Sequence, residues 1–192
     1  TATDTIAIGK SAIGAGVLTG TNNTAIGTSA GGDLTSGTYN NFIGFGAGQN
    51  ATTGDSNVAI GRQASGSGVL TGTNNVALGY QAGYDLTSGD HNFLSGFQAG
   101  ANVTTGTGNI FQGNEAGEFA TTANYGIAIG YEAIGTGVMT GTDNTAIGRL
   151  AGNELTTGTY NNFIGSGAGA NATTADRAIA IGALAIGNGV LT

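Results

Sequence analysis

One glycine recurs at intervals of 17 or 18 residues along the whole chain, and this repeat constrains the fold more than any other feature. These marker glycines are Gly9, Gly27, Gly44, Gly61, Gly79, Gly96, Gly113, Gly130, Gly148, Gly165 and Gly182. An alanine follows three residues after every marker glycine, and a threonine follows eight or ten residues after it. Eleven such units predict a repeat architecture in which each unit packs on its neighbours.

A longer period is superimposed on the short one, because three variants of the unit alternate. The cycle closes after 52 residues, from Gly9 to Gly61 and again from Gly130 to Gly182. Between Gly61 and Gly130 the distance is 69 residues, which is one cycle plus one unit of 17. Insertion of a complete unit suits a solenoid, in which contacts are made between adjacent turns, better than a globular topology.

Each unit contains a short β-type run such as "NVAIG", a turn of small residues, and a second short run such as "DLTSGT". No segment offers room for a helix of ten residues. The sequence therefore predicts an all-β fold: a parallel β-roll, or β-solenoid, of about eleven turns of 17 to 18 residues with two short strands per turn. At about 4.8 Å per turn the rod would be roughly 50 Å long. We interpret residues 1–192 as a single repeat domain and as a segment of a longer fibre protein.

Both faces of the first strand are apolar. The residue before the marker glycine is usually Ile, and we expect this column to form the core. The residue two before the glycine is apolar in all eleven units and alternation directs it to the opposite face. A solvent-exposed face would carry polar residues, so we expect this second column to contact other copies of the chain in a homotrimer. Its larger members, Phe42, Leu94, Phe111 and Phe163, are the predicted trimer interface.

Composition excludes several classes of function. Only four residues are Lys or Arg and the formal net charge is −7, so the basic surface that nucleic acid requires is missing. The chain has no Cys, so it forms neither a disulfide framework nor a thiolate metal site. No run of about 18 apolar residues is present, and we expect no membrane insertion of this segment.

The sequence contains no group of residues whose arrangement would support catalysis. His91 is the only histidine, and it aligns with Tyr39 and Tyr160 of related units, so it is interpreted as a surface substitution and not as a general base. Asp33, Asp85 and Glu154 share one repeat position, but they are not on adjacent turns and lack the signature of calcium-binding rolls. We therefore predict that the protein is not an enzyme, with no catalytic residues, no metal site and no cofactor.

Two surface features leave binding functions open. Phe45, Tyr80, Phe97 and Tyr131 follow marker glycines and would face outward, where aromatic rings could contact a sugar or a partner surface. The alternative is that these rings fill grooves between adjacent chains. The threonine column raises a second alternative, a single-chain solenoid that binds ice or another surface, although β-propensity and hydrogen bonding between turns equally explain it.

The runs "NNTAIG", "NVAIGRQA", "NNVALGYQAG" and "GIAIGYEA" resemble the head repeats of YadA-like trimeric autotransporter adhesins and similar repeats of phage tail-fibre proteins. The resemblance covers essentially the whole chain. It implies a left-handed parallel β-roll in each chain and three rolls packed about a common axis. It also implies an extracellular location, on the bacterial cell surface or in a phage virion fibre, and a structural and adhesive function with a host-surface glycan or protein as receptor.

Overall fold

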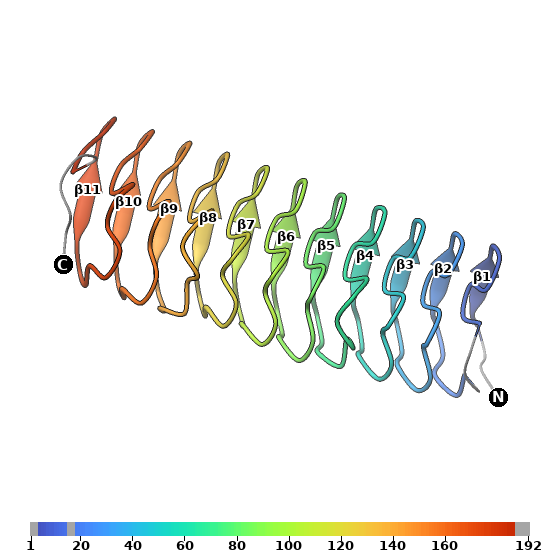
Figure 1. The fold of residues 1–192 in the computed structure, drawn as a ribbon. Helices are drawn as coiled ribbons and strands as arrows, with labels where there is room; N and C mark the ends of the chain where they lie inside the picture. The colour runs from blue at the N-terminus through green and yellow to red at the C-terminus, as the bar shows by residue number, and fades with distance from the viewer. Residues whose placement is uncertain (1–3, 15–17, 187–192) are drawn as a thin grey trace.

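The chain winds into a rod of stacked coils, each carrying one short strand (Figure 1). The computed structural model describes residues 4–14 and 18–186. Its strands are β1 (Ile6–Ile8), β2 (Thr24–Ile26), β3 (Asn41–Ile43), β4 (Val58–Ile60), β5 (Val76–Leu78), β6 (Phe93–Ser95), β7 (Ile110–Gln112), β8 (Ile127–Ile129), β9 (Thr145–Ile147), β10 (Asn162–Ile164) and β11 (Ile179–Ile181). They form one parallel sheet in sequence order, and no helix occurs among the described residues. The predicted all-β parallel solenoid is confirmed.

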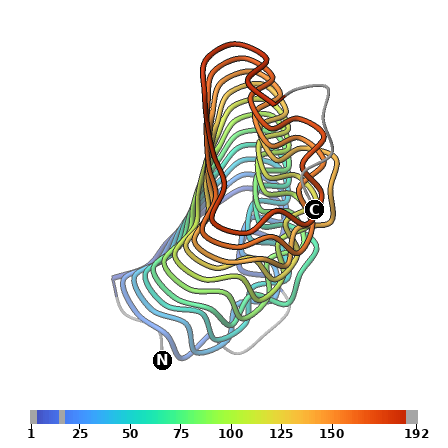
Figure 2. The same cartoon turned by 90° about the vertical axis from the view of Figure 1, so that its left-hand side faces the viewer.

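The coils lie in register, so that equivalent residues of successive units form columns along the rod (Figure 2). At the centre of the strands, for example, Phe42 pairs with Ala25 on one side and with Ala59 on the other. The coil that contains β7, which is the additional unit, pairs with β6 and β8 in the same way. A whole extra unit therefore lengthens the rod without disturbing the columns. Coils are numbered below by the strand that they contain.

The prediction of a second strand in each turn is wrong, because the structure has one strand per coil. Around Thr35, the backbone N–H groups of Thr35 and Gly37 both donate to the carbonyl oxygen of Thr52, at 3.0 and 3.3 Å. A regular parallel ladder distributes its bonds evenly over successive acceptors, whereas one acceptor shared by two donors requires a bend. The second run is consequently hydrogen-bonded from coil to coil but is not a strand.

The marker glycines are required by backbone conformation and by close approach. Gly27 has a φ of 130°, a conformation that L side chains rarely adopt. A Cβ atom at Gly27 would lie 2.5 Å from the carbonyl oxygen of Gly44 in the next coil. Both conditions recur at Gly44, with a φ of 133° and the carbonyl oxygen of Gly61 at 2.5 Å. The glycine column thus marks the point where the chain leaves each strand and the coils approach most closely.

The central residue of each strand points into the coil, which reverses the predicted orientation. The four residues predicted at a trimer interface, Phe42, Leu94, Phe111 and Phe163, are all at most 1% exposed within a single chain. Phe42 lies between two glycines, since a Cβ atom at Gly31 or Gly48 would come within 3.0 or 2.6 Å of its ring. The ring thus occupies space that these glycines leave inside the coil. The prediction that this column contacts neighbouring chains is wrong, and the column of Ile residues faces outward instead.

Core packing accounts for the 52-residue period. Three buried positions share the interior of coils 2 to 10: the central strand residue, the residue four after the marker glycine, and a residue in the second run. They are Ala128, Ile134 and Met139 in coil 8, Ala146, Gly152 and Leu155 in coil 9, and Phe163, Gly169 and Ala172 in coil 10. A large residue at one position is matched by small residues at the others, because protein interiors are close-packed. The three unit types are three ways of filling one cross-section.

A buried ladder of asparagines runs beside the sheet. Its members, which directly precede the strands, are Asn23, Asn40, Asn57, Asn75, Asn92, Asn109, Asn144 and Asn161. The side-chain oxygen of Asn57 accepts bonds from the backbone N–H and the side-chain amide of Asn75, at 3.0 and 3.1 Å. The Asn57 amide donates in turn to the carbonyl oxygen of Gly72 at 2.9 Å. No buried side-chain polar atom of the described residues lacks a hydrogen-bond partner. The buried amides of the ladder are therefore all hydrogen-bonded.

Candidate functional site

The outward side of the sheet carries a row of exposed apolar residues along the rod. We define the outer sheet face as the first and third residues of every strand, whose side chains point away from the coil. None of these residues is charged. Large side chains on it are substantially exposed, including Ile60 at 41% and Ile164 at 39%. Residues of this kind normally lie inside proteins, so their regular exposure suggests an interaction surface.

The apolar surface remains continuous where the Ile column is interrupted. In β6 and β7 the third strand residue is polar, Ser95 and Gln112, but the first is Phe93 or Ile110. Phe93 and Ile110 are 38% and 41% exposed. In these two coils the exposed apolar residue is therefore the first residue of the strand, whereas in the other coils the third residue is aliphatic. A strip about 50 Å long and about 10 Å wide covers on the order of 500 Å², at the size of the largest apolar patches of monomeric proteins.

Three of the four aromatic residues proposed as ligand contacts come together with an arginine. Tyr80 and Phe97 stack with ring centroids 5.2 Å apart and an interplanar angle of 12°. The guanidinium carbon of Arg62 lies 5.6 Å from the Tyr80 ring centroid and 6.0 Å from that of Phe45. These four residues, the aromatic column, occupy coils 3 to 6 in succession. Both faces of the Tyr80 ring are covered by its neighbours, so the column is held together mainly by its own stacking.

A second column reinforces the aromatic column. The side-chain amide of Gln81 donates to the side-chain oxygen of Gln63 at 3.4 Å, and that of Gln98 donates to Gln81 at 3.3 Å. Each glutamine directly follows a member of the aromatic column. Tyr131 is separate from this group, because Asn114 occupies the equivalent position of the intervening coil. The predicted contact residues thus form one cluster of three and one isolated tyrosine.

Five members of the threonine column donate their hydroxyls to the next coil. The hydroxyl of Thr35 donates to the carbonyl oxygen of Thr52 at 3.1 Å, and that of Thr104 donates to Thr121 at 3.1 Å. The Thr156 hydroxyl bonds to the Thr173 carbonyl in the same way, at 2.8 Å. A hydroxyl that is bound within the rod is less available to order water on a flat surface. This geometry favours a structural function of the column over ice binding.

His91 lies exposed at a corner of its coil. Its backbone φ is 59°, and the equivalent Tyr39 and Tyr160 have φ values of 58° and 59°. The His91 Nε2 atom lies 3.5 Å from the side-chain nitrogen of Asn74, at the limit of a hydrogen bond. The residue thus takes the place of the corner tyrosines, as the repeat alignment predicts.

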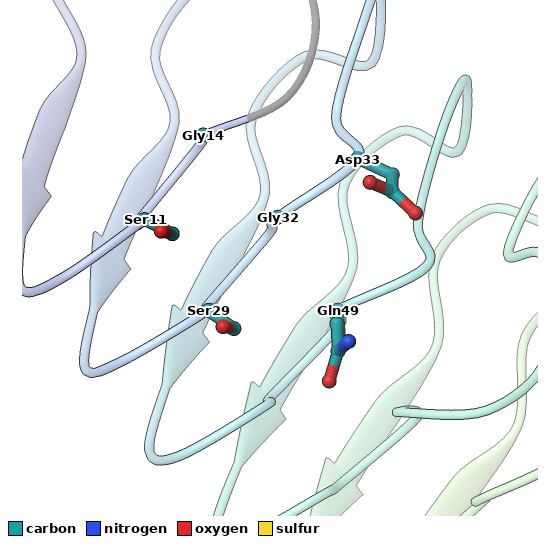
Figure 3. A pocket seen from close by; sticks show the side chains of 6 residues that line it. All are labelled: Ser11, Gly14, Ser29, Gly32, Asp33 and Gln49. Atoms are coloured by element: carbon teal, nitrogen blue, oxygen red, sulfur yellow. The ribbon is translucent and has the colours of Figure 1, made fainter.

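The acidic residues are dispersed. Among the described residues, no group of three or more His, Cys, Asp and Glu side chains is arranged to hold a metal ion. Asp33 lies at a surface hollow of about 230 Å³ that is also lined by Ser11, Gly14, Ser29, Gly32 and Gln49 (Figure 3). Ser11 and Ser29 stand where later coils have longer side chains such as Gln63 and Gln81, so the hollow reflects a local change of side-chain size.

Three ionisable groups have shifted pKa values. Partial burial raises the pKa of Glu118, and the negative charges of Glu115 and Glu132 raise it further. A hydrogen bond with the Glu132 side chain raises the pKa of the Tyr131 hydroxyl. The pKa of Asp176 is lowered because its carboxylate accepts bonds from the backbone N–H and the hydroxyl of Thr159, at 2.7 and 2.9 Å. Each pKa shift follows from hydrogen bonds or from the proximity of acidic side chains. None of the three shifts creates a pair of groups suited to proton transfer.

The described part of the chain contains no helix of the length and apolarity needed to cross a bilayer. Comparisons with protein-family models, with curated proteins and with solved structures find no match. The functional argument therefore depends on the surfaces of the rod.

Proposed function

We propose that the chain is a structural segment of an extracellular fibre, on a bacterial surface or in a phage virion, in which three copies pack through their outer sheet faces. The observation that carries the proposal is the uncharged outer sheet face, which continues along all eleven strands. A single coil buries little apolar surface, because many of its core residues are alanines. Association through the exposed strip would add burial along the whole length of the rod.

The repeat architecture supports projection as the mechanical part of this function. Each coil adds about 4.8 Å to the rod, so the number of units sets the distance between its two ends. Columns in register preserve the same surfaces at every level. Such a segment can hold a binding region away from its anchor without changing shape.

The aromatic column supports an adhesive part. It presents Phe45 and Phe97 at 53% and 44% exposure on a surface beside the outer sheet face. We propose that this surface contacts a host glycan or protein. On a glycan array, replacement of both residues by serine should abolish binding by the purified segment. Unchanged binding would exclude the aromatic column as the contact and leave projection as its function.

The mass of the 18.5 kDa chain in solution tests the association. We expect light scattering to give about three times the mass of one chain, and Ile147→Ser with Ile164→Ser to lower it to one. Val69→Ser with Val138→Ser is a matched control, because these valines are 52% and 53% exposed but lie outside the outer sheet face. A wild-type monomer would contradict the proposal.

A further inference from the structure

Arg62 lies between two aromatic rings of neighbouring coils. Its guanidinium carbon is 6.0 Å from the ring centroid of Phe45 in coil 3 and 5.6 Å from that of Tyr80 in coil 5. These distances are within the range of cation–π attraction. Coils 3 and 5 are two levels apart, about 9.6 Å along the rod, which leaves room for one planar group between the rings. Phe45 and Tyr80, which we call the first aromatic pair, thus hold a guanidinium group of their own chain.

The same pair of rings recurs three coils later without a cation between them. The equivalent residues, 51 or 52 positions further along the chain, are Phe97, Asn114 and Tyr131. They lie in successive coils, since the backbone N–H of Glu115 donates to the Phe97 carbonyl oxygen at 2.8 Å. The N–H of Glu132 donates to the Asn114 carbonyl oxygen at 2.9 Å. Phe97 and Tyr131, the second aromatic pair, are 44% and 47% exposed, and an exposed Asn114 stands between them.

The side chains beside the rings change from neutral to acidic between the two pairs. Gln63 and Gln81 accompany the first pair, and their equivalents at the second pair are Glu115 and Glu132. A third acid, Glu118, lies close to both glutamates, because their negative charges raise its pKa and no positive charge offsets them. In the part of the chain that the structure describes, none of these three glutamates forms an ion pair. The second pair is thus surrounded by negative charge that the chain itself does not neutralise.

The level between the second pair is open to a group from outside. Tyr80 covers one face of the Phe97 ring, so the other face is turned toward coil 7. The next basic residue of the column is Arg149 in coil 9, on the far side of Tyr131, and among the described residues it makes no ring contact with that tyrosine. The described acids are not arranged to hold a metal ion either. A planar organic cation therefore fits the position better than a metal ion does.

We propose that Phe97, Tyr131 and the carboxylates of Glu115 and Glu132 bind the guanidinium group of an arginine in a partner polypeptide. The group would lie over Asn114, about 4.8 Å along the rod from each ring. Guanidinium suits this site better than ammonium, because it is planar, stacks on aromatic faces and forms bidentate bonds with carboxylates. The formal net charge of −7 favours the approach of a basic partner. The site shares Phe97 with the aromatic column, but it requires neither a glycan contact nor the association of copies.

A peptide with a single arginine tests the site. The full chain is titrated at low salt with acetyl-Gly-Gly-Arg-Gly-Gly-amide, and NMR follows the backbone amide signals of Asn114, Glu115 and Glu132. The same peptide with uncharged citrulline should bind at least about tenfold more weakly. Glu115→Gln with Glu132→Gln, which reproduces the amides of the first pair, should raise the dissociation constant about tenfold. Asp33→Asn with Glu154→Gln, at exposed positions, removes the same charge elsewhere and should change the constant less than about twofold.

Two further variants exchange the properties of the two pairs. Asn114→Arg supplies the guanidinium group from the chain itself and should abolish the peptide-induced shifts. Arg62→Asn with Gln63→Glu and Gln81→Glu should create a second site, so that two peptides bind per chain. Circular dichroism confirms that each variant folds.

The proposal would be overturned by equal binding of the arginine and citrulline peptides, or by an unchanged constant in the variant without the two glutamates. Binding by Asn114→Arg as tight as by wild type would also overturn it, as would a triple variant that still binds one peptide. None of these outcomes changes the mass of the wild-type chain in solution, so the proposed fibre is tested separately.

Discussion

The inner and outer faces of the strands differ in how their residues vary from coil to coil. On the inner face, the central residue of β2 to β11 changes between Ala, Leu and Phe from coil to coil, yet it stays buried because neighbouring positions compensate in size. On the outer sheet face, the third strand residue is an aliphatic in nine of the eleven strands, although much of its surface is exposed. The interior therefore tolerates exchange as long as volume is kept, whereas the exterior keeps one kind of side chain without an internal packing reason.

This difference separates the stability of a coil from the proposed association of copies. Inner residues should determine the free energy of unfolding of the single chain, and outer residues the affinity between chains. Unfolding measured at low protein concentration isolates the first term, because association stabilises only the folded state.

The largest effect is expected from Phe111→Ala, which would leave a cavity at a completely buried position. We expect the free energy of unfolding to fall by about 3–5 kcal/mol. Phe93→Ala is the control in the adjacent coil, where the ring is 38% exposed. It should cost about 1 kcal/mol. Urea unfolding of the two variants measures the contrast, and equal losses would refute the assignment of inner and outer faces.

The second-largest loss of unfolding free energy is expected from a substitution in the asparagine ladder. Asn75→Ala removes the acceptor of the Asn92 backbone N–H at 3.0 Å and the donor to the Gly89 carbonyl oxygen at 2.8 Å, both in buried positions. Unpaired buried groups of this kind should cost about 1–3 kcal/mol. Asn74→Ala, one residue away and exposed, should cost less than about 0.5 kcal/mol. Thermal unfolding compares them, and a neutral Asn75→Ala would mean that water replaces the ladder.

A smaller effect is expected in the aromatic column. Tyr80→Ala removes the stacking with Phe97 and the contact with Arg62, and should lower the unfolding free energy by about 0.5–1.5 kcal/mol. Tyr131→Ala serves as control, because Tyr131 lies outside the column. If both substitutions cost the same in urea unfolding, the stacking contributes nothing beyond the burial of each ring.

The smallest effect concerns Glu118. Because its pKa is raised above the ordinary 4.5, the folded state favours the protonated form, and ionisation reduces stability as the pH rises through that region. Glu118→Gln should therefore stabilise the chain by a few tenths of a kcal/mol at pH 7 and leave it unchanged near pH 3. Glu154→Gln, at an exposed position, should have no effect at either pH. A stabilisation that persists at pH 3 would show that charge is not the cause.

The sequence predicts the stacking of units well but not the direction of the strand side chains. Regular glycines, alanines and short β-type runs indicate one coil per unit, and the structure agrees. Alternation places two columns on opposite faces, but both are apolar, so it cannot say which face is inside. The informative signal is covariation of size: Phe42 occurs with Gly48, and Phe163 with Gly169, whereas the Ile column varies with nothing inside the coil.

The asparagine ladder was also hidden for a physical reason. An Asn before a strand can be a turn residue or a buried hydrogen-bonding group, and local sequence favours the turn. Two of the three replacements at this position, Gly126 and Ala178, are small and apolar, which is consistent with burial, and the third is Thr5 in the terminal coil.

The direction of the hydrogen bonds has a mechanical consequence. Backbone bonds and the asparagine ladder both connect one coil to the next, so they point along the rod. A load applied to the two ends would pull on these bonds one coil at a time, as a zip opens, and would not shear all of them together. Each released coil of 17 residues would add on the order of 50 Å of extended chain. Single copies should therefore yield in equal steps at low force, and lateral packing of several copies would raise that force by requiring their coils to open together.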